Sequence, residues 1–172
     1  LVADVAEGAG EPQLTRLLVA LFNLMQAKEY AGQERAWGAI GFACGRFEPA
    51  LCERLQQLQH AQSEQLLSAR ELGSAILDNA ILDEQLSGNA DLQQLRKLMQ
   101  QLSDGTEVAA ALSEVWFEFS TQRIDQLYQL EQQVLQALHA KAQQKLNEGE
   151  QAMRQHRQQL RSLSERTAGP EQ

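Results

Sequence analysis

Apolar side chains in the first quarter of the chain recur at alternating spacings of four and three residues, the period of one buried face of an α-helix. The residues at these spacings are Leu14, Leu18, Leu21, Met25, Lys28, Gly32, Arg35, Ala39 and Phe42. Because Lys28 and Arg35 are cations, the pattern predicts two positive charges that point into the protein. A buried charge without a partner is costly, so we expect a carboxylate or a bound anion to meet them.

The composition predicts an all-α protein. Of the 172 residues 43% are hydrophobic but only 5% are aromatic, and Leu, Ala, Gln and Glu are prominent. This length suits one domain, or one domain with an appendage. Glycine, proline and capping residues divide the sequence into a linker or helix end and four predicted helices, which cover residues 1–10, 11–44, 48–86, 91–102 and 106–165.

The last predicted helix is long enough to leave the bundle. Its first half has one apolar face, formed by Leu112, Trp116, Phe119, Arg123, Leu127, Leu130, Val134 and Leu138. Its second half keeps a four-three alternation that is typical of a coiled-coil seam, formed by Leu146, Gly149, Met153, His156, Leu160 and Leu163. A projecting helix with an apolar stripe needs a partner, so we expect a homodimer or a connection to another domain.

The inward cations are the candidate anion-binding residues. Lys28 and Arg35 lie about 10 Å apart on one helix face, with Gly32 between them leaving space, and a guanidinium offers two parallel donors to a planar oxyanion. Arg123 is a second inward arginine, and Arg96 is a weaker candidate at the edge of its helix face. The alternative is that bundle carboxylates pair with these cations in a structural ion network.

Several classes of function lack support in the sequence. The 15 basic and 23 acidic residues give a net charge of -8, which argues against direct binding of nucleic acid. Membrane-spanning runs, metal-ligand spacings, phosphate loops and catalytic motifs do not occur, so we expect no membrane segment, no cofactor, no metal and no enzymatic activity. Cys44 and Cys52 flank a predicted turn; two small buried thiols are favoured over a disulfide across the turn.

Two blocks of the chain resemble the nitrate- and nitrite-sensing family, known as the NIT domain. The second and weaker block is Trp116-Phe117 with the Thr121–Asp125 run. The first and more specific block consists of Phe22–Gln26, Lys28-Glu29, Ala31–Ala36, Gly38-Ala39 and Gly41–Ala43. The resemblance covers roughly residues 14–140.

The resemblance implies a helical receptor with two up-and-down four-helix bundles, of which this chain is similar to the second. It implies a sensor domain at 11–140, a connector helix and tail at 141–172, and nitrate or nitrite as the ligand of Arg35, with Arg123 and Lys28 assisting. The expected partners are a homodimer mate or an N-terminal companion bundle, and an output domain in signal transduction or transcription regulation. The cytoplasm is the expected compartment, with the periplasm as the alternative. The competing hypothesis is a structural bundle or coiled-coil interaction module without a small-molecule ligand.

Overall fold

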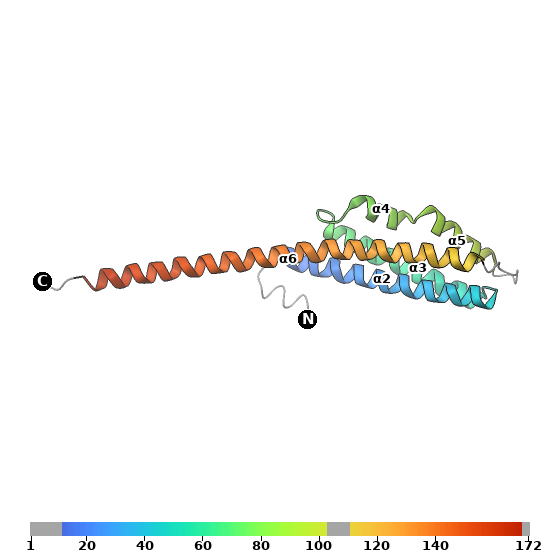
Figure 1. Cartoon of the computed structure of the whole chain (residues 1–172), viewed down its shortest axis with the longest axis horizontal. Coiled ribbons are helices and arrows are strands. Elements are labelled where there is room, and N and C mark those ends of the chain that lie inside the picture. The colour runs from blue at the N-terminus through green and yellow to red at the C-terminus, as the bar shows by residue number, and fades with distance from the viewer. Residues whose placement is uncertain (1–11, 103–110, 170–172) are drawn as a thin grey trace.

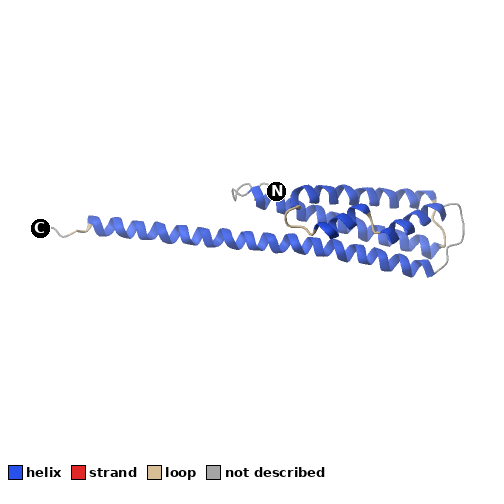
Figure 2. Cartoon of the chain, turned by 90° about the horizontal axis from the view of Figure 1, so that it is seen from above, coloured by secondary structure: helices blue, strands red, loops and turns tan. Residues whose placement is uncertain are grey.

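The computed structural model describes residues 12–102 and 111–169, and this part of the chain is almost entirely helical (Figures 1 and 2). Its elements are α2 (Pro12–Cys44), α3 (Pro49–Gly73), α4 (Asn79–Ser87), α5 (Ala90–Gln101) and α6 (Ala111–Thr167). The helices α4 and α5 follow one another along the same side of the bundle. Together they take the place of the third helix in an up-and-down four-helix bundle. The predicted all-α bundle is confirmed. The predicted linker over 1–10 and the turn before the last helix lie outside the described residues.

The second predicted helix is wrong in one respect, because the structure divides it into α3 and α4. The α3 helix ends at Gly73, and the buried side chain of Leu77 packs against this glycine, 3.1 Å from the position that a Cβ would occupy. Asp78 then begins α4, and its carboxylate accepts hydrogen bonds from the main-chain N–H groups of residues 80 and 81, at 3.0 and 3.2 Å. The main-chain N–H of Asp78 donates to Gln133 of α6 at 2.7 Å, which fixes the break against the bundle.

The core face of α2 also differs from the prediction. The buried residues of α2 are Leu17, Ala20, Leu24, Ala27, Ala31, Glu34, Gly38, Gly41 and Phe42, so the face lies one position before the predicted one at most sites. At the two glycines of this face, neighbouring aromatic rings take the space that a side chain would fill. A Cβ on Gly38 would lie 2.6 Å from Cζ2 of Trp116, and a Cβ on Gly41 would lie 2.7 Å from Cζ of Phe47. Lys28 and Arg35 therefore lie at the edge of the buried face, with intermediate exposure.

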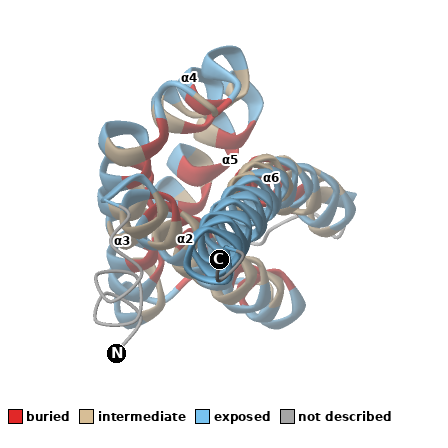
Figure 3. Cartoon of the chain, turned by 90° about the vertical axis from the view of Figure 1, so that its left-hand side faces the viewer, coloured by how far each residue is buried: buried red, intermediate tan, exposed pale blue. Residues whose placement is uncertain are grey.

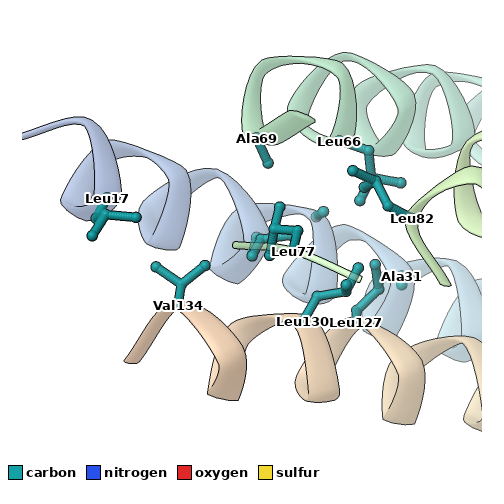
Figure 4. Packing of buried hydrophobic residues seen from close by; sticks show 11 residues of the cluster. Leu17, Ala31, Leu66, Ala69, Leu77, Leu82, Leu127, Leu130 and Val134 are labelled. Carbon is teal, nitrogen blue, oxygen red and sulfur yellow. The ribbon is translucent and has the colours of Figure 1, made fainter. Parts of the chain in front are cut away.

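The bundle has two apolar clusters. One lies around the α2–α3 turn, where Phe47 and Trp116 are fully buried. The other occupies the opposite half, between α2, α3 and α6, with Leu77 inserted from the α3–α4 connection (Figure 4). Its buried members are Leu17, Leu24, Ala27, Ala31, Leu66, Ala69, Leu77, Leu82, Leu127, Leu130 and Val134. The predicted apolar face of the last helix is thus confirmed, and it holds α6 against the rest of the bundle.

The α6 helix is 57 residues long, which corresponds to about 85 Å. Only its first half packs in the bundle. Residues 142–169 are all exposed, and Figure 3 shows this part as a pale blue helix that runs toward the viewer. The predicted projection is confirmed. No helix in the described ranges is both long and apolar enough to cross a membrane.

Candidate site: a buried arginine network and a cationic edge

Each of the five described helices contributes one buried polar side chain to a network in the middle of the bundle. The members are Glu34 from α2, Gln62 from α3, Gln85 from α4, Arg96 from α5 and Arg123 from α6, and none is more than 6% exposed. Buried polar groups are stable only when they are hydrogen-bonded, so this network fixes how the five helices face one another.

Glu34 and Arg96 form the ion pair of this network. The Nε of Arg96 donates to Glu34 Oε2 at 2.9 Å, and its Nη2 donates to Glu34 Oε1 at 2.7 Å. Gln62 adds a third bond, from Nε2 to Glu34 Oε1 at 3.0 Å. This bidentate geometry is the strong form of an arginine–carboxylate pair. The structural alternative from the sequence, a carboxylate that neutralises an inward cation, therefore holds for Arg96.

Arg123 has only neutral partners. Its Nε donates to Gln62 Oε1 at 2.8 Å, and its Nη1 donates to the main-chain and side-chain oxygens of Gln85, both at 3.0 Å. Within the described residues no carboxylate lies in ion-pair contact with Arg123, although its side chain is almost fully buried. The pKa of Arg123 is lowered to about 10, mainly because burial disfavours the charged form; the positive charge of Arg96 also contributes to the lowering, and Glu34 opposes it.

The network therefore has one positive charge in excess. Two guanidinium groups, Arg96 and Arg123, face a single carboxylate, Glu34, so the formal sum is +1. A buried excess charge is costly, and a small anion would compensate it.

Arg35 occupies a separate position, at the edge between α2 and α6. Its Nη1 donates to Thr121 Oγ1 at 3.0 Å, and its guanidinium carbon lies 5.0 Å from the centre of the Phe117 ring. The main-chain oxygen of Arg35 accepts a 3.1 Å hydrogen bond from Nε1 of Trp116. In the part of the chain that the structure describes, Arg35 has no ion pair with a carboxylate. Its guanidinium thus remains able to meet a ligand.

Lys28 lies on the same edge, but its charge is already compensated. Its Nζ is 2.6 Å from Glu131 Oε2, an ion-pair contact without hydrogen-bond geometry, and 5.2 Å from the centre of the Tyr128 ring. Gly32 lies between Lys28 and Arg35, and a Cβ placed there would meet nothing within 4 Å. The space that the sequence predicts beside Arg35 is therefore present.

The structure does not bring the two predicted arginines onto a shared partner. Thr121, the partner of Arg35, and Arg123 are two residues apart on α6, which separates their directions by about 200°. Gln62 is fully buried, and it is not among the site residues predicted from the sequence. The buried residues Leu58 and Leu66 lie four positions before and after Gln62, and this spacing is the signal that Gln62 belongs to the core face.

The two cysteines are free, but they are less buried than predicted. Cys44 is exposed and Cys52 is half-buried. Burial raises the pKa of the Cys52 thiol.

Comparisons with known proteins place the chain in a family. Residues 1–139 match the family model for nitrate and nitrite sensing, called NIT. A curated relative, the nitrate regulatory protein of Klebsiella oxytoca, is 34% identical over 135 residues; the match covers 77% of this chain and 33% of the relative, so the chain spans about a third of that protein's length. No solved structure matches significantly. The chain belongs to the NIT family of nitrate- and nitrite-sensing domains, as its sequence motifs predicted.

Proposed function

We propose that this chain is the anion-binding part of a nitrate or nitrite sensor, and that its arginines bind the anion. The observation that carries this proposal is that Arg35 and Arg123, two arginines in the bundle, have no carboxylate partner among the described residues. Nitrate and nitrite are small planar oxyanions, and a guanidinium donates two parallel hydrogen bonds to such a group.

Arg35 is the primary ligand in this proposal. It is accessible from solvent, it is held by Thr121 and Phe117, and it lies beside the open space at Gly32. Lys28 contributes positive potential from the other side of Gly32, while Glu131 limits its role to a secondary one. Arg123 acts from inside the bundle, where its uncompensated charge attracts an anion toward α6.

The α6 helix is the proposed route to an output domain. Its first half lies in the bundle, where it contains Arg123 and contacts Arg35 through Thr121, and the helix continues without a break to Thr167. The curated relative is named a nitrate regulatory protein and is about three times as long as the matched region, so an attached regulatory domain suits this arrangement. A change in how α6 packs would then move the whole projecting segment. A cytoplasmic setting, with the periplasm as the alternative, is part of the proposal.

Thermal unfolding tests the binding step. A ligand at a hundred times its Kd stabilises the folded state by about 2.7 kcal/mol, which raises the Tm of a chain of this size by about 5–10 °C. We expect this shift with nitrate or nitrite, and not with chloride or sulfate at equal ionic strength. An unchanged Tm in the wild-type chain would refute direct binding and leave the structural interaction module as the function.

Substitutions locate the ligand. Arg35→Ala should remove the nitrate-dependent shift but keep the fold, because the hydrogen bond from Trp116 goes to the main-chain oxygen of residue 35. Arg54→Ala is the matched control. Arg54 is an exposed arginine that, like Arg35, makes a side-chain hydrogen bond between two helices, in this case from α3 to Gln33 of α2. A nitrate-dependent rise in Tm that persists in Arg35→Ala but disappears in Arg123→Gln would show that the anion binds in the interior of the bundle and not at the α2–α6 edge.

A further inference from the structure

Three residues of α6 hold Arg35 of α2. The indole Nε1 of Trp116 donates to the main-chain oxygen of Arg35 at 3.1 Å. The ring centre of Phe117 lies 5.0 Å from the guanidinium carbon, and Thr121 Oγ1 accepts a 3.0 Å hydrogen bond from Nη1. The first contact fixes the main chain at Arg35, while the other two fix its side chain. The direction of the guanidinium therefore depends on how α6 packs against α2.

The two helices are held close together at this point. Gly38 lies nearly one turn after Arg35, and a Cβ there would be 2.6 Å from Cζ2 of Trp116, which is fully buried. A buried ring packed on a glycine allows little relative movement of the helices. Phe117 and Thr121 are four residues apart, so they lie on one side of α6 and both stay beside Arg35.

The hydrogen bond to Thr121 distinguishes the two edges of the guanidinium. A planar oxyanion can accept from the Nη1–Nη2 pair or from the Nε–Nη2 pair, and in either case it receives two N–H groups. Nη1 already donates to Thr121, whereas among the residues that the structure describes no hydrogen bond reaches Nε or Nη2 of Arg35. The Nε–Nη2 pair is thus the edge with both nitrogens available to a ligand.

We propose that Thr121 is a positioning residue for the anion, because it holds the guanidinium of Arg35 in one orientation and leaves the Nε–Nη2 edge to nitrate or nitrite. This inference rests on the proposed function, in which Arg35 is the primary ligand. An arginine side chain that is mobile before binding must lose its rotamer freedom when the anion fixes it, and this loss weakens binding by about three- to tenfold. Thr121 removes that loss in advance.

Calorimetry with nitrate tests the role of the hydroxyl. Thr121→Val keeps a β-branched side chain but removes the acceptor, so its Kd should rise by about three- to tenfold. Thr121→Ser keeps the hydroxyl and should bind within about twofold of the wild type. Thr167→Val is the matched control, since the Thr167 hydroxyl lies at the far end of α6 and donates to the main-chain oxygens of Leu163 and Ser164.

The orientation of Arg35 can also be measured without an anion. The Nε–H NMR signal of Arg35 is assigned by its loss in Arg35→Ala. The order parameter of this group should be high in the wild type and in Thr121→Ser, and it should fall below about 0.6 in Thr121→Val. An order parameter that is equal in the wild type and Thr121→Val would overturn the positioning role.

The binding results separate this inference from the proposed function. A wild-type chain that binds no nitrate would refute both. Nitrate binding that Thr121→Val leaves unchanged would refute the role of Thr121 alone. A weaker Kd in Thr121→Val that Thr121→Ser shares would show that the branched shape matters and not the hydroxyl, and it would also overturn the inference.

Discussion

The two glycines at 38 and 32 of α2 predict opposite effects of the same substitution. Replacing Gly38 by Ala would place a Cβ 2.6 Å from Cζ2 of the fully buried Trp116, so the indole must move. Overpacking of this kind costs about 1–3 kcal/mol. Displacement of the indole also threatens its hydrogen bond to Arg35 O, and an unpaired buried donor costs about 1–3 kcal/mol. The gain in helix propensity offsets only about 1 kcal/mol, so Gly38→Ala should destabilise the bundle by about 2–3 kcal/mol.

Gly32→Ala is the matched control on the same helix. Beyond the backbone of α2 itself, no atom lies within 4 Å of the position that its Cβ would take, so only the helix propensity changes, and the substitution should stabilise by about 0.5–1 kcal/mol. Urea unfolding followed by circular dichroism at 222 nm measures both variants. In thermal melts the expected changes are about -5 to -10 °C for Gly38→Ala and about +1 to +4 °C for Gly32→Ala. A Gly38→Ala variant as stable as the wild type would refute the close approach of α2 to α6.

Three further predictions concern the network, the α3–α4 break and the thiols. Glu34→Gln removes the carboxylate partner of buried Arg96 and should lower the free energy of unfolding by about 3–5 kcal/mol in urea; a loss below 1 kcal/mol would contradict the assigned ion pair. Asp78→Ala removes the N-cap of α4 and should cost about 1 kcal/mol, with hydrogen exchange rising first in α4. Iodoacetamide should modify the exposed Cys44 before Cys52. The modification rate of Cys52 should keep rising above pH 9, because burial raises the pKa of its thiol. Equal modification rates of the two cysteines at pH 8, measured by mass spectrometry, would contradict this order.

Helix limits and the projecting segment follow from local signals, and for that reason the sequence predicts them well. Pro12 and Pro49 occur in the first turns of α2 and α3, and Gly45 adopts a positive φ of 73° just after α2. The exposed seam after residue 141 likewise depends only on spacing along one helix. The break after Gly73 depends on Leu77 entering the core, which is a tertiary event.

The orientation of α2 about its axis could not be read from its large apolar residues. Alanine and glycine carry little hydrophobic signal, yet they line the core. At Gly38 and Gly41 the reason is that Trp116 and Phe47 come from other elements and fill the space above them. Rotation by one position moves Met25 to the surface and Glu34 to the interior, where Arg96 neutralises it. Identifying that pair needs the contact between α2 and α5, and residues 62 apart in sequence give no local sign of it.

The free-energy cost of burying the charge of Arg123 gives an upper limit to the binding free energy that an anion obtains by compensating this charge. Its pKa of about 10 in the folded protein lies below the ordinary value for arginine, so the unfolded state binds more protons between the folded and unfolded pKa values, and stability rises with pH in that window. Below about pH 10 both states are charged, and the folded state bears the full cost of about 3 kcal/mol. An anion that neutralised this charge would recover up to that amount, roughly a hundredfold in affinity. Arg123 belongs to α6, and its hydrogen-bond partners belong to α3 and α4. Anion binding would therefore change the free energy of packing of α6 against these two helices. The nitrate-dependent gain in stability should therefore shrink in Arg123→Gln; an equal gain in this variant and the wild type would show that the buried charge takes no part in binding.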